Sequence, residues 1–211
     1  MEDSKLISQL VKLHAAEEEP EPKEKEEKEK EGDGFGKRLL KARVIMISEP
    51  ITDRLARNVV AQCILMQEES VIQPITIYIN SPGGSADSGF AIYDILRFVN
   101  PPIRTLCTGL CASAAVLIYL APQKNMRFSL PNSRFLLHQP STSLSGTASD
   151  IEINANEIIK MRERYNGIVA AETNKTVAQV TQHADRDFWL SAQEAMDYGL
   201  VGKIIQTYKE M

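Results

Sequence analysis

From residue 39 to the C-terminus, short apolar runs alternate with longer stretches in which apolar residues recur every three or four positions. The short runs are typical of buried β-strands. Five strands are predicted, at residues 43–48, 74–80, 103–108, 126–130 and 134–138.

The longer stretches have the periodicity of amphipathic helices, at residues 52–69, 86–99, 112–120, 149–172 and 192–198. Two of them begin with a serine followed three residues later by a glutamate, Ser149 with Glu152 and Ser191 with Glu194. This spacing predicts a capping box, and Gly199 is placed to end the last helix in a left-handed conformation. Strands that alternate with helices indicate an α/β fold with a parallel sheet.

The N-terminal segment has a different composition. Residues 17–31 contain nine Glu and four Lys, a charge of −5, whereas the whole chain carries −4. Leu6, Leu10 and Leu13 have helical spacing ahead of this run. We therefore expect two parts: residues 1–33, an acidic, disordered tail with a short amphipathic helix, and residues 34–211, a single globular domain.

Charge and cysteine content exclude several classes of protein. The chain without residues 17–31 has a net charge of +1, so a general nucleic-acid surface is not expected. The longest apolar runs are far too short to cross a membrane, and no membrane association is expected. Cys63, Cys107 and Cys111 form neither a disulfide framework nor a zinc motif, which favours buried thiols and a cytoplasmic protein without a metal.

Four junctions between strands and helices carry candidate chemistry. Ser113 lies among small residues where a strand meets an apolar helix, and Gly83 and Gly84 form a tight turn after another strand. His138 ends a strand, and Asp187 lies in a polar stretch ahead of an aromatic pair. Each has an ordinary alternative: a helix-capping serine, a simple turn, a structural histidine and a solvated loop. Together they supply the nucleophile, base, carboxylate and oxyanion donors of acyl transfer.

Six ordered segments resemble one family. They are RLLKARVI (38–45), YINSPGG (78–84) with GFAIYDIL (89–96), GLCASAA (109–115), LPNSR…HQP (130–140), SDIEINANEI (149–158) and DRDFWLSAQEAMDYGLVGKI (185–204). From about Leu39 to the C-terminus, the chain resembles the proteolytic subunit of Clp protease, a serine peptidase. The resemblance implies a spiral of β-β-α units, shared with crotonases, with a protruding strand-helix handle at about residues 141–172.

The resemblance also implies site residues. Ser113 would be the nucleophile, His138 the general base and Asp187 the orienting acid, with the N–H groups of Gly84 and Ala114 as the oxyanion hole. Leu144, Ser145 and Gly146 would run beside the bound peptide. Tyr78 and Phe128 would belong to a docking pocket for the partner ATPase. The family commonly has Met and Gly directly after the nucleophile, whereas this chain has Ala114 and Ala115.

The partners implied are a Clp-family AAA+ ATPase, polypeptide substrates and further copies of the chain in two stacked heptameric rings, with a second paralogous subunit as an option. No cofactor is implied, because ATP would be used by the ATPase. Ile151, Ile158 and Ile159 are expected on the ring-facing surface of the 149–172 helix. Three alternatives stay open: a non-catalytic or weakly active ring subunit paired with an active paralogue, a crotonase-type acyl-CoA enzyme, and a pure binding module.

Overall fold

The computed structural model describes residues 34–141 and 145–211. The chain divides into two units, Met1–Lys41 and Ala42–Met211. In the first unit, the described residues 34–41 are helical. The predicted tail, residues 1–33, lies outside the described residues. The second unit holds every described residue of the predicted site.

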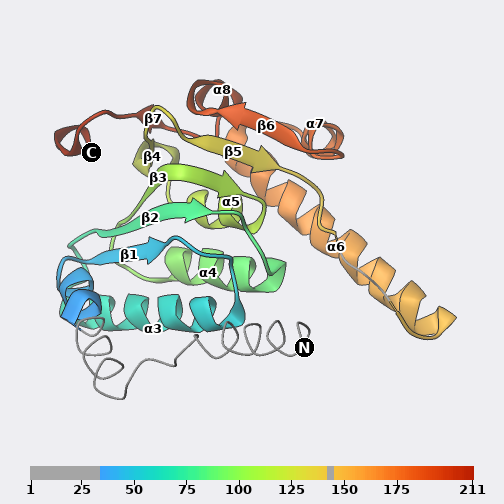
Figure 1. The fold of residues 1–211 in the computed structure, drawn as a ribbon, viewed down its shortest axis with the longest axis horizontal. Helices are drawn as coiled ribbons and strands as arrows, with labels where there is room; N and C mark the ends of the chain where they lie inside the picture. The colour runs from blue at the N-terminus through green and yellow to red at the C-terminus, as the bar shows by residue number, and fades with distance from the viewer. Residues whose placement is uncertain (1–33, 142–144) are drawn as a thin grey trace, which may run out of the picture. The chain divides into compact units, whose positions relative to one another are not determined.

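The second unit is an α/β layer structure built on a mixed, mainly parallel sheet (Figure 1). Its parallel strands run in the order β1 (Val44–Ile47), β2 (Ile75–Ser81), β3 (Ile103–Ala112), β4 (Arg127–Ser129) and β7 (Lys203–Ile204). Strand β5 (Arg134–Leu137) pairs in parallel with the end of β3, and β6 (Phe188–Ser191) pairs with β5 in antiparallel fashion. The predicted α/β class and parallel core are therefore confirmed.

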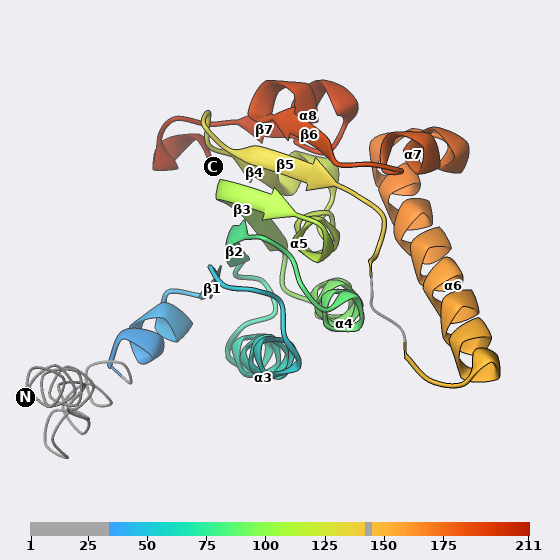
Figure 2. The same ribbon diagram turned by 45° about the vertical axis from the view of Figure 1, so that its right-hand side comes forward.

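Three helices cover one face of the sheet: α3 (Asp53–Glu69), α4 (Ala86–Phe98) and α5 (Ala114–Tyr119) (Figures 1 and 2). Helix α5 is buried along its whole length, as its run of apolar residues requires. The long helix α6 (Ala148–Thr173) protrudes from the body (Figure 2). Helices α7 (Val177–His183) and α8 (Ala192–Tyr198) follow, with 3₁₀ turns at Lys124–Met126 and Tyr208–Glu210.

Of the two predicted capping boxes, the one at α8 is confirmed and the one at α6 is not. Ser191 and Glu194 form the predicted capping box of α8, and Gly199 ends that helix with a φ of 105°. The capping box predicted at Ser149 is wrong. Helix α6 begins at Ala148, and Thr147 caps it by accepting a hydrogen bond from the Asp150 N–H, so Ser149 is already inside the first turn.

The sequence patterns did not predict α7, β6 or the two-residue strand β7 in the C-terminal part. Residues 177–183 form α7, which is capped by a reciprocal box between Thr176 and Gln179. Residues 188–191 form β6, because pairing with β5 outweighs the loop-like polarity that precedes it. The described residues between β5 and α6, 138–141 and 145–147, form no strand.

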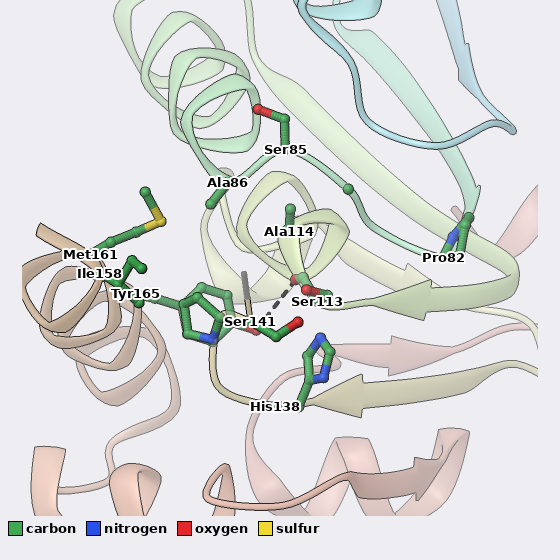
Figure 3. A pocket seen from close by; sticks show the side chains of 12 residues that line it. Pro82, Ser85, Ala86, Ser113, Ala114, His138, Ser141, Ile158, Met161 and Tyr165 are labelled. Atoms are coloured by element: carbon green, nitrogen blue, oxygen red, sulfur yellow. Dashed lines mark hydrogen bonds between the residues drawn. The ribbon is translucent and has the colours of Figure 1, made fainter. Parts of the chain in front are cut away.

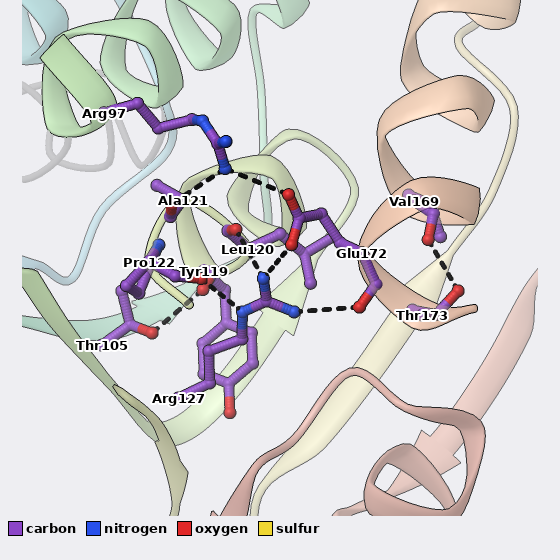
Figure 4. A network of polar contacts seen from close by, with 10 residues as sticks. All are labelled: Arg97, Thr105, Tyr119, Leu120, Ala121, Pro122, Arg127, Val169, Glu172 and Thr173. Atoms are coloured by element: carbon purple, nitrogen blue, oxygen red, sulfur yellow. Dashed lines mark hydrogen bonds and ion pairs between the residues drawn. The ribbon is translucent and has the colours of Figure 1, made fainter. Parts of the chain in front are cut away.

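A buried arginine anchors the C-terminal end of α6 to the body (Figure 4). The side chain of Arg127 in β4 is fully buried, and its guanidinium donates to the carbonyl oxygens of Pro122, Leu120 and Glu172. It also pairs with the Glu172 carboxylate, which accepts a second hydrogen bond, of 3.0 Å, from Arg97 of α4. These contacts satisfy a charge that would otherwise be costly to bury. They fix the end of the helix whose middle lines the site described next.

Candidate active site

Ser113 lies at the turn between β3 and α5, in a conformation that few residues adopt. Its φ is 55° and its ψ −123°, and its side chain makes no capping hydrogen bond to the helix. The interpretation of Ser113 as an ordinary helix cap is therefore not supported. A positive φ at a residue other than glycine is strained and persists only where the surroundings hold it. The turn leaves the Ser113 hydroxyl free to act in the cavity beside it.

The backbone of Ser113 is held from both sides. Its N–H donates to the Leu136 carbonyl oxygen of β5 over 2.9 Å, and its carbonyl oxygen accepts from the Val116 N–H over 2.9 Å. Gly83 packs against the same turn with a φ of 88°. A Cβ at Gly83 would lie 2.6 Å from the Ala112 carbonyl oxygen and 2.7 Å from the Ser113 Cβ, so only glycine fits there.

The sheet register brings His138 and Asp187 together. In the antiparallel pair β5·β6, Leu137 lies opposite Phe188. The next positions in this register are His138 and Asp187, one residue beyond the end of each strand. The His138 Nδ1 is 3.4 Å from the Asp187 Oδ1, in a contact that is open to solvent because Asp187 is 64% and His138 30% exposed. The contact at Nδ1 leaves Nε2 free for another partner.

Parallel pairing brings Ser113 to the same place. Ala112 of β3 lies beside Leu136 of β5, and the carboxyl ends of parallel neighbours meet at one edge of a sheet. Ser113 and His138 follow these two strands and line the same cavity, of about 430 Å³. Figure 3 shows the two side chains together at this cavity.

The cavity is lined by four segments of the chain. They contribute Pro82, Gly84, Ser85 and Ala86; Ser113 and Ala114; His138, Pro140 and Ser141; and Ile158, Met161 and Tyr165. Both residues predicted as oxyanion donors, Gly84 and Ala114, therefore line the same cavity as Ser113. Ala114 is the first residue of α5, and the N–H of a first helical residue has no partner within the helix.

Among the described residues predicted to contact the peptide and the neighbouring subunits, only Ile158 lines the cavity. Ser145 and Gly146 are exposed ahead of α6, and Leu144 lies outside the described residues. Ile158, expected on a partner-facing surface, instead lines the cavity, while Ile151 and Ile159 are exposed as expected. Positions 151, 158 and 159 fall on one stripe of the helix, so spacing alone could not tell which of them faces the cavity.

Tyr78 and Phe128 lie on neighbouring parts of one apolar cluster. Phe128 is buried with Leu106 and Ile205, and Tyr78 packs against this cluster while remaining partly exposed. Burial, followed by the nearby Tyr208, raises the pKa of Tyr78. The cluster lies on β2, β3, β4 and the segment that follows β7, and none of its residues lines the cavity at Ser113.

The three cysteines are free and buried, as expected. Burial raises the pKa of the Cys63 thiol to about 12 and that of Cys111 well above its usual value. Neither is a nucleophile at neutral pH, because the thiolate is the reactive form. Among residues 34–141 and 145–211, no cluster of His, Cys, Asp and Glu has the arrangement of a metal site. No helix in these ranges combines the length and apolarity of a membrane span.

Sequence reasoning missed the residues that α6 contributes to the cavity. Tyr165 and Met161 lie on a helix more than twenty residues after His138, and they reach the cavity only through the packing of α6 against α5. Their one sequence signal is the apolar spacing of positions 158, 161 and 165 along the helix.

Comparison with known proteins identifies the family. Residues 26–208 match the family model described as Clp protease. The chain is 44% identical over 172 residues to the ATP-dependent Clp protease proteolytic subunit 2 of Treponema pallidum, covering 82% of this chain and 86% of that protein. It is 48% identical over 173 residues to proteolytic subunit 3 of Rhizobium johnstonii, covering 82% and 89%.

Solved structures agree with the sequence comparison. A point mutant of ClpP1 from Listeria monocytogenes superimposes with a TM-score of 0.77 at 42% identity, covering 83% of this chain and 98% of that one. Sequence and fold thus match members of the same family. The chain belongs to the Clp protease (ClpP) family of serine peptidases.

Proposed function

We propose that this chain is the proteolytic subunit of an ATP-dependent Clp-type protease, in which Ser113, His138 and Asp187 hydrolyse peptide bonds. The proposal rests on the grouping of these residues at and beside one cavity. Ser113 and His138 both line it, and His138 contacts Asp187 through Nδ1. The relatives, which are named ATP-dependent Clp protease proteolytic subunits, support the same reading.

The proposed mechanism assigns a role to each group. His138 takes the proton of the Ser113 hydroxyl through its free nitrogen as the oxygen attacks the peptide carbonyl, then passes the proton to the leaving amine. Asp187 holds the imidazole tautomer through Nδ1 and stabilises the imidazolium. The N–H groups of Gly84 and Ala114 stabilise the oxyanion, and water then releases the acyl group from Ser113.

The proposed assembly consists of two stacked heptameric rings that enclose the active sites, with an ATPase ring that unfolds and delivers polypeptides. Helix α6 protrudes from the body and carries exposed isoleucines, which suits contact between rings (Figure 2). The apolar cluster at Tyr78 and Phe128 is the proposed ATPase contact, and Ser145 and Gly146 are the proposed peptide contacts. The buried free thiols suit a cytoplasmic location. The alternative of a non-catalytic ring subunit gains no support.

This function is tested by comparing two substrates on the purified full-length assembly. A short fluorogenic peptide should be hydrolysed without ATP, because it can diffuse into an enclosed chamber. A stably folded protein should be degraded only with a Clp-type ATPase and ATP. Degradation of the folded protein by this chain alone would contradict an enclosed site, and failure to cleave the peptide would contradict the peptidase itself.

We predict that activity depends on the exposed isoleucines of α6. Ile151 is 39% and Ile159 44% exposed. Replacing both with glutamate should break ring stacking and lower peptide hydrolysis by roughly an order of magnitude, because burying two new charges at an interface is costly. Analytical ultracentrifugation and the peptide assay measure the two effects.

The matched control is Asn156→Glu, which adds a charge at another exposed position of the same helix. This variant should leave the mass of the assembly and the rate of peptide hydrolysis unchanged. A smaller assembly of the double variant that cleaves peptides at the wild-type rate would show that α6 does not support the active site through stacking.

A further inference from the structure

Tyr165 reaches from α6 to the backbone of the candidate nucleophile. Its side chain lines the cavity, the residue is only 4% exposed, and its hydroxyl donates a hydrogen bond of 3.3 Å to the carbonyl oxygen of Ser113. Figure 3 shows this contact as a dashed line between the helix and the turn. It spans 52 residues of sequence, so the packing of α6 against the body creates it.

The acceptor of this hydrogen bond belongs to the peptide unit that supplies an oxyanion donor. The Ser113 carbonyl and the Ala114 N–H are the two ends of one planar peptide group, so a group that fixes the oxygen also fixes the direction of the N–H. A hydrogen bond accepted by the carbonyl also polarises the amide and strengthens its N–H as a donor. The Val116 N–H already donates to this oxygen over 2.9 Å, and Tyr165 supplies a second donor.

The strained conformation of the Ser113 backbone explains why its carbonyl oxygen needs a second donor. Ser113 has a positive φ, and a strained turn keeps its geometry only when its surroundings over-determine it. Oxyanion stabilisation depends on donors that are in place before the reaction, so a small rotation of this peptide would weaken it. Burial raises the pKa of Tyr165, and its hydroxyl therefore stays protonated as a donor at any working pH.

We propose that Tyr165 is a positioning residue for catalysis: its hydroxyl orients and polarises the Ser113–Ala114 peptide so that the Ala114 N–H points at the developing oxyanion. The inference rests on the proposed roles of Ser113 and Ala114. Tyr165 itself touches neither the attacking oxygen nor the proton that His138 carries. A substitution can remove the hydroxyl of Tyr165 and keep its ring, which fills space in the wall of the cavity.

The test removes the hydroxyl alone. In the full-length assembly, Tyr165→Phe should lower kcat for a short peptide by roughly fivefold to tenfold, the size of one net hydrogen bond, with KM within about twofold of wild type. A peptide boronate, whose tetrahedral adduct places an oxygen at the oxyanion site, should bind more weakly by a similar factor. Rates are expressed per Ser113 titrated with a fluorophosphonate, so that a loss of folded enzyme does not count as a loss of rate.

Tyr119 provides the matched control. Like Tyr165 it is buried, and its hydroxyl donates to a backbone carbonyl, that of Phe128, over 3.1 Å. Tyr119→Phe should reduce the melting temperature by as much as Tyr165→Phe does but leave kcat per titrated Ser113 and boronate affinity unchanged. Tyr165→Met, which also lacks the hydroxyl and adapts to irregular space, should reproduce the loss seen with Tyr165→Phe.

Two results would overturn the inference. One is a kcat per titrated Ser113 and a boronate affinity within about twofold of wild type for both Tyr165 variants. The other is an equal loss in Tyr119→Phe, which would make the effect one of general stability. In either case Ser113 would still be labelled in the Tyr165 variants, whereas failure of the proposed function would appear as no labelling of Ser113 in the wild-type protein.

Discussion

Replacing Ser113 with alanine should lower kcat for a short fluorogenic peptide by roughly 10⁵-fold to 10⁶-fold, the size of effect that loss of a triad nucleophile has in serine peptidases. The physical reason is that the hydroxyl takes part in bond formation, while the oxyanion donors and the cavity remain. Stability should change little, because the Ser113 side chain makes no capping hydrogen bond in the fold. The peptide assay and a melting curve measure the two effects.

The control for this variant is Ser141→Ala, which removes another hydroxyl from the wall of the same cavity. It should retain peptide hydrolysis within about threefold, because Ser141 has no role in the proposed proton transfer. Equal losses in the two variants, or hydrolysis that persists in Ser113→Ala, would show that the nucleophile lies elsewhere.

Replacing Asp187 with asparagine should lower kcat by roughly 10³-fold to 10⁴-fold. An amide can donate to Nδ1 and so favours the tautomer whose Nε2 carries the proton, which prevents His138 from accepting the proton of Ser113. The arrangement of the site residues should be preserved, because Asp187 is largely exposed and asparagine has a side chain of the same size. Single-turnover kinetics on the titrated enzyme measure the loss.

Asp185→Asn is the matched control, since it removes the same charge two residues away. Asp185 is exposed, and its backbone carbonyl, which accepts a hydrogen bond from the Gln139 side chain, is unchanged by the replacement. It should keep most of the wild-type rate. A large loss in Asp185→Asn with none in Asp187→Asn would mean that the carboxylate partner of His138 has been misidentified.

Local patterns in the sequence were sufficient for most of the sheet and helices. The five predicted strands lie within two residues of observed strands at nearly every end, because each is a short apolar run between polar turns. Strand β3 is the exception: it extends to Ala112, four residues beyond the prediction, because its last residues pair with β5. Nothing local in the sequence encodes that second partner.

The remaining differences arise from contacts between distant segments. Strand β6 exists because it pairs with β5, some fifty residues earlier, and the same pairing sets Asp187 beside His138. Tyr165 reaches Ser113, and Arg127 reaches Glu172, through packing of α6 that no local pattern contains. The residue types of the site could be proposed from sequence, but the second donor to the Ser113 carbonyl required the structure.

The most direct test of the central claim is to locate the residue that reacts with a fluorophosphonate, which labels only an activated serine. The full-length assembly is treated with the reagent, digested and mapped by mass spectrometry, with Ser113→Ala and His138→Ala treated in parallel. We expect a single adduct per chain on Ser113, none in Ser113→Ala, and much slower labelling in His138→Ala. An unlabelled wild-type chain, or an adduct on a different serine, would contradict the central claim.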